Sequence, residues 1–400
     1  MKILQINSVC GVGSTGRIAT DIHDILQEHG HESWIAYGRG EAKNCENTIK
    51  IGNKLDNYTH VAKTRLLDQH GFGSKKATLE FLEKVKKLDP DVIHLHNIHG
   101  YYINIELLFS YLKKAKKKVI WTLHDCWAFT GHCAYFDFRE CNCWKIEGDN
   151  KCIQSRSYPS SWLLNNSKEN FQRKKAAFSG IEDLTIVTPS NWLAELVKKS
   201  FLKNYTVNVV NNGIDLGVFK PTESNFKLKY KLENKFTLLG VASIWDERKG
   251  LEYFLKLSKM ISTNEYIILI GLTEKQQKNL PLNIIGIDKT NNIEQLAEIY
   301  SAADVFVNPT LEDNFPTTNI EALACGTPVV TFNTGGSIES IDESCGKVVD
   351  KGDSVKLFKS IKEAKELKRT ACRQRSLKYE KKTQYKKYLE IYIGELDEKY

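Results

Sequence analysis

The stretch NPTLEDNFPTTNIEALACGTPVVTFNTGG, residues 308–336, indicates more about the fold of this chain than any other segment. Two acidic residues, Asp313 and Glu321, lie eight positions apart within it. A loop rich in helix-breaking residues separates them and leads into a helical pattern, with Thr317 or Thr318 as the expected N-cap. The stretch therefore predicts a strand–loop–helix–strand unit of an α/β domain, with one carboxylate on each side of the helix start.

The start of that helix predicts a ligand. Backbone N–H groups and the positive end of a helix favour a phosphate, whereas carboxylates accept hydrogen bonds from ribose or sugar hydroxyls. Gly326 ends the helix, a β-branched strand follows, and Gly335 and Gly336 form another turn. These parts suit a nucleotide-sugar site. The alternative is an ordinary strand–helix junction without a ligand.

Strand and helix patterns alternate twice along the chain. In the first half, strands are expected near residues 2–9, 33–38, 91–97, 118–125, 183–190 and 206–215, with helices near 17–29, 76–88, 105–117 and 191–201. In the second half, strands are expected near residues 236–243, 266–271, 283–287, 304–310, 327–332 and 346–350. Such alternation gives parallel sheets. The fold class expected is therefore α/β, with two Rossmann-like domains that face each other across a cleft and divide near residues 213–222.

Length and composition fit an enzyme with two α/β domains. The chain has 400 residues, 41% of them hydrophobic and 26% charged, as in soluble globular proteins of two domains. Its apolar runs stay well short of the ~20 residues that span a bilayer. We therefore expect a cytoplasmic protein, either free or peripheral on the inner face of the cell membrane.

The net charge of +8 is concentrated near the C-terminus. Residues 351–400 hold fifteen lysines and arginines against eight acidic residues. Tyr385, Tyr388, Leu389 and Tyr392 recur there at helical spacing. Two interpretations stay open: a packed helix with a solvated lysine face, or a helix that contacts an anionic membrane surface. Because the chain lacks the motifs of nucleic-acid-binding proteins, we expect no nucleic-acid partner.

The segment 308–336 resembles the acid-x7-acid signature of the retaining glycosyltransferase family 4, including the C-G-x-P-V-V word that follows it. The surrounding sequence is most similar to the bacterial branch that builds capsule, exopolysaccharide and O-antigen. Asp313 occupies the position of the family's first Glu, and Pro316 replaces a Gly. The resemblance covers essentially the whole chain and implies the GT-B architecture. Its domains would be residues 1–212 and 213–379, with a helix near 380–400 packed back on the first.

The resemblance implies that a sugar moves from a nucleotide diphosphate sugar, of the UDP or GDP series, without a required cofactor. In the family, basic residues rather than Mg²⁺ hold the diphosphate. Lys249 matches the family's Lys, Ser243 stands where the family usually has Arg, and Arg248 is the candidate to compensate. Phe315 and the helix start at Thr317 and Thr318 complete the donor site in this interpretation.

The two acids and one histidine are the candidate catalytic residues. Glu321 would bind ribose hydroxyls, and Asp313 would bind sugar hydroxyls. His124, in a T-x-H-D word that the family shares, would lie near the reacting sugar. The alternative for His124 is a structural histidine. The acceptor implied is a growing lipid-linked saccharide.

The acceptor side is expected in the first domain. His96, Asn97 and His99 follow one strand, and Asp125 follows the next, so parallel strands would bring them to one edge of the sheet. Three histidines in HLHNIHG superficially suggest a metal site, but their placement along a strand and its loop favours a lining role.

Residues 11–16 match G-x-G-x-x-G after a strand and before a helix. Family members carry a similar glycine-rich turn, in which Gly13 would approach the donor phosphates. The same motif opens dinucleotide-binding folds, and Arg39 after the second strand would suit a 2′-phosphate. An NADP-dependent reductase therefore stays open as an alternative, as does a nucleotide-sugar epimerase.

Five cysteines crowd one segment of the first half. They are Cys126, Cys133, Cys141, Cys143 and Cys152. Their spacing lacks the C-x2-C pair of a standard zinc ribbon. A structural zinc and a set of reduced thiols are both compatible with the pattern, and any metal here would be structural rather than catalytic.

Overall fold

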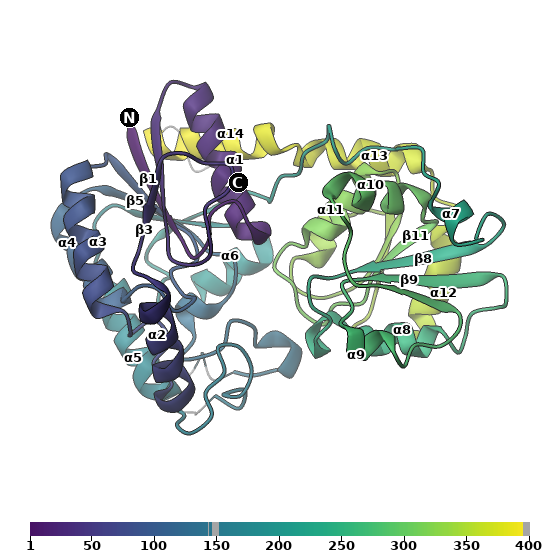
Figure 1. Ribbon diagram of the computed structural model, residues 1–400, viewed down its shortest axis with the longest axis horizontal. Helices are drawn as coiled ribbons and strands as arrows, with labels where there is room; N and C mark the ends of the chain where they lie inside the picture. The colour runs from purple at the N-terminus through teal and green to yellow at the C-terminus, as the bar shows by residue number, and fades with distance from the viewer. Residues whose placement is uncertain (143, 146–151, 395–400) are drawn as a thin grey trace. The chain divides into compact units, whose positions relative to one another are not determined.

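The computed structural model describes residues 1–142, 144–145 and 152–394. They form two compact units, one made of Met1–Asn211 together with the chain from Tyr385, the other of Asn212–Gln384. Each unit is built on its own parallel sheet (Figure 1). The predicted α/β class, with two parallel-sheet domains, is confirmed.

The sheet of the first unit has seven strands in the order β3-β2-β1-β4-β5-β6-β7. Its strands are β1 (Lys2–Asn7), β2 (Glu32–Tyr37), β3 (Thr48–Lys50), β4 (Val92–Leu95), β5 (Lys118–Thr122), β6 (Leu184–Thr188) and β7 (Thr206–Val209). Its helices are α1 (Gly13–Glu28), α2 (Lys54–Leu67), α3 (Lys75–Leu88), α4 (Ile105–Ala115), α5 (Ser167–Phe178) and α6 (Asn191–Lys198). Short 3₁₀ turns η1 (Trp127–Phe129) and η2 (Asp137–Arg139) follow β5.

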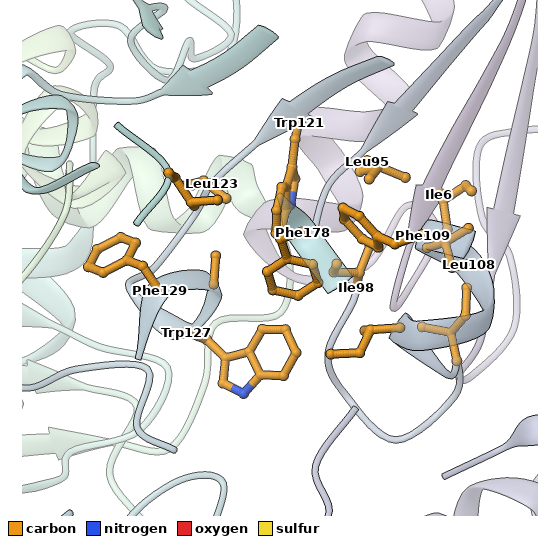
Figure 2. Close-up of a cluster of buried hydrophobic side chains, with 14 of the residues drawn as sticks. Ile6, Leu95, Ile98, Leu108, Phe109, Trp121, Leu123, Trp127, Phe129 and Phe178 are labelled. Carbon is orange, nitrogen blue, oxygen red and sulfur yellow. The ribbon is translucent and has the colours of Figure 1, made fainter. Parts of the chain in front are cut away.

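Aromatic side chains fill the core on one face of this sheet, under α3, α4 and α5. Trp121 of β5 packs against Phe109 of α4 and Phe178 of α5, with ring centroids 5.3 and 4.8 Å away, and Figure 2 shows these three rings together. Burying such rings contributes a few kcal/mol each. This face therefore holds β4 and β5, and the residues at their ends, in a rigid frame.

The opposite face of the first sheet is covered by α1 and by the C-terminal helix α14 (Lys381–Ile393). Tyr385, Tyr388, Leu389 and Tyr392 are all buried in this layer. The hydroxyl of Tyr392 lies 2.7 Å from Nδ1 of His94, and that of Tyr388 lies 3.0 Å from the Thr122 hydroxyl. Helix α14 therefore packs on this sheet through its tyrosines and Leu389.

The second unit has six parallel strands in the order β10-β9-β8-β11-β12-β13. They are β8 (Phe236–Val241), β9 (Glu265–Ile270), β10 (Ile284–Ile287), β11 (Val305–Asn308), β12 (Val329–Phe332) and β13 (Gly346–Val349). The helices are α7 (Phe226–Lys229), α8 (Leu251–Leu257), α9 (Glu274–Gln277), α10 (Ile293–Ala302), α11 (Thr317–Ala324), α12 (Ser354–Ala364) and α13 (Arg369–Ser376). The 3₁₀ turns are η3 (Glu247–Lys249), η4 (Ser337–Ser340) and η5 (Leu377–Tyr379). Two apolar layers, one under α10 and α11 and the other under α8 and α12, cover the two faces of the sheet.

Three elements of the first unit escaped the sequence analysis. Strand β3 has only three residues and lies at the sheet edge, so its alternation is too short to detect. Helix α5 is rich in charged residues, and α2 buries only His60 and Thr64 of its fourteen residues. Apolar periodicity, the main sequence signal for a helix, is therefore absent from α2.

Among the residues that the structure describes, helices long and apolar enough to cross a membrane are not found.

Candidate active site

Two loops at the carboxyl ends of β8 and β11 meet in the second unit. The main-chain N–H of Leu311 donates to the carbonyl of Arg248 at 2.7 Å. Gly250 makes this approach possible, because it adopts φ +76° and a Cβ there would lie 2.1 Å from the carbonyl oxygen of Pro309. A glycine after the lysine is therefore needed to bring Lys249 to the end of β11.

The meeting of these loops pairs Lys249 with Asp313. Nζ of Lys249 lies 2.5 Å from Oδ2 of Asp313, and the Arg248 guanidinium lies 3.8 Å from the same oxygen. Arg248 also donates to the carbonyl of Glu312 at 2.8 Å, so its side chain points toward the site and not into solvent. Burial alone would raise the pKa of Asp313, but the charges of Lys249 and Arg248 hold it below its ordinary value. Two cations thus lie beside the ionised carboxylate of Asp313.

The glycine pair after β12 supports Asp313 from behind. The N–H of Gly336 donates to the carbonyl of Asp313 at 2.9 Å. Gly335 adopts φ +54°, and a Cβ there would lie 2.0 Å from the same carbonyl oxygen. The predicted turn at these glycines therefore fixes the backbone that carries the acidic residue.

Helix α11 begins one residue earlier than a threonine cap would place it. Pro316 is the N-cap residue and provides no side-chain cap, while Thr317 and Thr318 are the first two helical residues. The expectation of a threonine cap is wrong, because proline fixes the extended conformation that an N-cap requires. With neither a side-chain cap nor an acidic residue in the first turn, the helix start offers its N–H groups to an anion.

A buried amide holds α11 in place. Asn319 accepts a hydrogen bond from the Asn308 side chain at 2.8 Å and donates to the carbonyl of Ser337 at 3.0 Å. The ring of Phe315 is buried and packs against Tyr379, so Phe315 presents only its backbone to a ligand. The helix start is thus anchored by buried contacts on both sides.

Glu321 lies one turn inside α11, as predicted, and is largely buried. The hydroxyl of Tyr300, from α10, donates to Oε2 of Glu321 at 3.0 Å. Burial and then the Glu321 carboxylate raise the pKa of Tyr300 well above its ordinary value, so the phenol stays a donor. Sequence analysis missed Tyr300, because an aromatic residue in an apolar helix carries no local signal of its distant partner.

The structure brings His96 and His124 together at the carboxyl ends of β4 and β5 in the first unit. Their rings stack with Nδ1 of His96 3.2 Å from Nε2 of His124, and the other nitrogen of His96 lies 3.0 Å from the Gln5 side chain. Burial lowers the pKa of His124 to about 4 and holds that of His96 well below its ordinary value. Both imidazoles are therefore neutral at pH 7.

A second pair lies next to them. Nε2 of His99 is 2.9 Å from Oδ2 of Asp125, and the other nitrogen of His99 is 3.1 Å from the hydroxyl of Tyr158. Together with Asn97, these histidines and Asp125 line one small cavity. The four predicted acceptor-side residues therefore share a place in the fold, and Tyr158 is an addition that sequence analysis missed.

The glycine-rich turn lies at the end of β1. Gly13 is exposed, begins α1 and adopts φ +65°. Arg39, which would hold a 2′-phosphate in a reductase, places its guanidinium 5.7 Å from the centre of the Tyr101 ring.

The four described cysteines of the crowded segment, Cys126, Cys133, Cys141 and Cys152, are buried in the first core. Cys143 lies outside the described residues. Among the described residues, no group of three or more His, Cys, Asp or Glu side chains that could hold a metal ion is found.

Two glycosyltransferase family models match this chain. The family model described as Glycosyltransferase Family 4 matches residues 15–218, and that described as Glycosyl transferases group 1 matches residues 235–366. A colanic acid biosynthesis glycosyl transferase, WcaC of Escherichia coli, is 24% identical over 392 residues, which cover 90% of each chain.

Two further proteins resemble the chain. A UDP-Gal:alpha-D-GlcNAc-diphosphoundecaprenol alpha-1,3-galactosyltransferase of Escherichia coli is 27% identical over 159 residues, which cover 35% of this chain and 40% of the relative. The solved structure of a sucrose-phosphate synthase from Thermosynechococcus elongatus superposes with a TM-score of 0.74 at 17% identity, covering 98% of this chain and 99% of the other. The two-domain GT-B fold is thereby confirmed, and neither the reductase nor the epimerase alternative is favoured. The chain belongs to glycosyltransferase family 4 and is a glycosyltransferase.

Proposed function

We propose that this enzyme transfers a sugar from a nucleotide diphosphate sugar to a lipid-linked saccharide during surface polysaccharide synthesis, with retention of anomeric configuration. One observation supports the donor part of this proposal. Lys249 and Arg248 lie next to Asp313, beside a helix start in α11 that has no side-chain cap. Paired cations and free helix N–H groups are suited to a diphosphate.

In this proposal the donor's diphosphate lies between Lys249 and the N–H groups of Thr317 and Thr318. The glycosidic bond breaks at the anomeric carbon, and negative charge develops on the departing phosphate. Fixed cations stabilise that charge more in the transition state than in the ground state. Asp313 holds Lys249 in place, and its carboxylate oxygens can still accept hydrogen bonds from sugar hydroxyls.

Retention follows from a front-face substitution. The acceptor hydroxyl forms its bond to the anomeric carbon on the side from which the phosphate leaves, and its proton passes to a departing phosphate oxygen. We assign His124 to the sugar's reactive side, where a neutral imidazole can exchange hydrogen bonds with hydroxyls. We assign Gly13 to the donor phosphates.

The acceptor half of the proposal rests on the first unit and on the relatives. His96, Asn97, His99 and Asp125 lie together at the carboxyl ends of β4 and β5 and carry both hydrogen-bond donors and acceptors, as saccharide hydroxyls require. The diphosphoundecaprenol-linked substrate in the name of one relative, and the colanic acid in the name of another, support a lipid-linked acceptor. The enzyme would then work as a peripheral protein at the cytoplasmic membrane face.

Thermal unfolding with UDP, GDP, ADP or NADP(H), each at millimolar concentration with and without EDTA, tests the donor site. We expect one nucleoside diphosphate to raise the melting temperature by several degrees, because a ligand present at about 100 times its Kd stabilises by about 2.7 kcal/mol. The shift should persist in EDTA. A response to NADP(H) alone would contradict the proposal.

Glu321→Gln tests the assignment of Glu321 to the ribose. We expect donor affinity to fall about tenfold to a hundredfold, because charge-assisted hydrogen bonds to hydroxyls are replaced by weaker neutral ones. Calorimetric titration with the nucleoside diphosphate measures this loss. Glu294→Gln, an exposed glutamate of α10, is the matched control. Unchanged affinity in Glu321→Gln would remove Glu321 from the donor site.

A further inference from the structure

Helix α2 has an inverted distribution of side chains. It buries two polar residues, His60 and Thr64, and exposes large apolar ones. Leu55 is 73% exposed, Tyr58 70% and Leu66 43%, and the helical period places all three on one outward face. Helices of globular proteins normally have the opposite pattern, so this face is not explained by the core of the first unit.

A loop that also exposes large apolar side chains lies against the C-terminal end of α2. The N–H of Trp162 donates to the carbonyl of Arg65 at 2.7 Å, and the Arg65 guanidinium donates to the carbonyl of Ser160 at 2.8 Å. These bonds place Trp162, which is 63% exposed, and Leu163, which is 72% exposed, beside the C-terminal turn of the helix. The apolar face defined here comprises Leu55, Tyr58, Leu66, Leu67, Trp162, Leu163 and Leu164. Figure 1 shows α2 at the periphery of the first unit.

The charges around the apolar face are mostly positive. Residues 54–67 and 152–168 contain Lys54, Lys63, Arg65, Arg156 and Lys168, against Asp56 as their one acidic residue. Asp56 is occupied in the capping box of α2 with Asn53. An exposed set of Leu, Trp and Tyr with lysine and arginine around it matches a bilayer interface, where aromatic rings lie at headgroup level and cations contact anionic lipids.

We infer that the apolar face binds an anionic phospholipid bilayer, with Trp162 and Leu163 inserted among the headgroups. This inference extends the proposed function, since a lipid-linked acceptor lies at such a surface, but its test requires no sugar transfer. It assigns membrane contact to α2 and the loop after residue 160, because the tyrosines of the C-terminal helix are buried in the first unit.

Co-sedimentation with vesicles tests the inference. The full chain is mixed with vesicles of phosphatidylglycerol and phosphatidylcholine, or of phosphatidylcholine alone, at low and high salt. We expect binding to the anionic vesicles that weakens with salt, and binding about tenfold to a hundredfold weaker for Trp162→Ser with Leu163→Ser. The matched control is Leu282→Ser with Val355→Ser, two apolar residues of the second unit that are at least as exposed, and this variant should bind as the wild type does.

Three results would overturn the inference: no binding of the wild type to anionic vesicles, equal binding of the Trp162/Leu163 variant, or a concentration-dependent dimer that this variant abolishes. The last result would make the apolar face an interface between two copies of the chain. The melting-temperature shift with nucleoside diphosphate, measured on the same variants, separates the two proposals. If that shift is absent while vesicle binding persists, only the transferase proposal fails; if it persists without vesicle binding, only the membrane inference fails.

Discussion

Replacement of Lys249 by alanine is expected to lower kcat for sugar transfer about a hundredfold to a thousandfold, the usual cost of losing one group that stabilises developing charge. Nζ of Lys249 already lies 2.5 Å from Asp313, so the cation is held in place before any donor binds. Its removal takes away the charge assigned to the diphosphate and also leaves Asp313 with a weaker partner, since Arg248 is 3.8 Å away. Single-turnover transfer from the nucleotide sugar identified by the melting experiment measures the effect.

A second lysine of the same region provides the control. Lys256 belongs to α8, lies 3.6 Å from Glu252 and is half exposed. Lys256→Ala should keep transfer within about twofold, because exposed ion pairs contribute little. Lys249→Arg keeps the charge but changes its geometry, and should retain more activity than Lys249→Ala. Full activity in Lys249→Ala would place the diphosphate elsewhere.

Acidification from pH 7.5 to pH 5 is expected to remove several kcal/mol from the unfolding free energy of the first unit. Burial lowers the pKa of His60 to about 4 and that of His94 to about 3, against about 6.5 in an unfolded chain. Nε2 of His60 accepts hydrogen bonds from the N–H groups of Gly71 and Gly73, which a protonated nitrogen cannot do.

The direction of this pH effect on the free energy of unfolding follows from proton binding. Both folded-state pKa values lie below the unfolded value, so the unfolded chain binds more protons below pH 6.5 and stability falls as pH falls toward 4. At pH 5 each of these two histidines lowers the free energy of unfolding by about 2 kcal/mol. Burial likewise lowers the pKa values of His70 and His96, which adds in the same direction. The free energy of unfolding of a typical domain is about 5–15 kcal/mol, so this loss is a large fraction of the total stability.

Urea unfolding at the two pH values, followed by tryptophan fluorescence, measures the loss, since all tryptophans except Trp245 belong to the first unit. His60→Gln should reduce the difference between the two pH values by about 2 kcal/mol. Replacement of the exposed, non-titrating Gln27 by alanine should leave the difference unchanged. An equal unfolding free energy at both pH values in the wild type would contradict buried neutral histidines.

The parallel sheets were predictable because their signals are local. The strands of the second unit are short β-branched runs such as Val329–Phe332, and each is followed by a turn or helix within a few residues. Asp313 and Glu321 could be placed on either side of the α11 start from spacing alone. Helix α2 could not be predicted, because its residues turn polar groups inward and apolar groups outward.

The partners of the site residues were not predictable in this way. Lys249 and Asp313 are 64 positions apart, and Tyr300 reaches Glu321 from another helix. Their meeting depends on backbone approach at Gly250 and Gly335, whose positive φ angles show only in the folded chain. The local sequence of the basic C-terminal helix left two interpretations open, and the burial of its tyrosines against β4 and β5 shows only in the folded chain.

The sequence by itself determined the strand–helix alternation, the family resemblance and the identity of the two acids, because propensity, periodicity and motif spacing act over a few residues. Only the tertiary structure decided that Arg248 turns toward Asp313, that His96 and His124 stack as neutral rings, and that α2 presents leucines outward. These outcomes depend on burial and on contacts between residues distant in the chain. Charge pairing, pKa and exposure are set by what surrounds a side chain after the chain has folded.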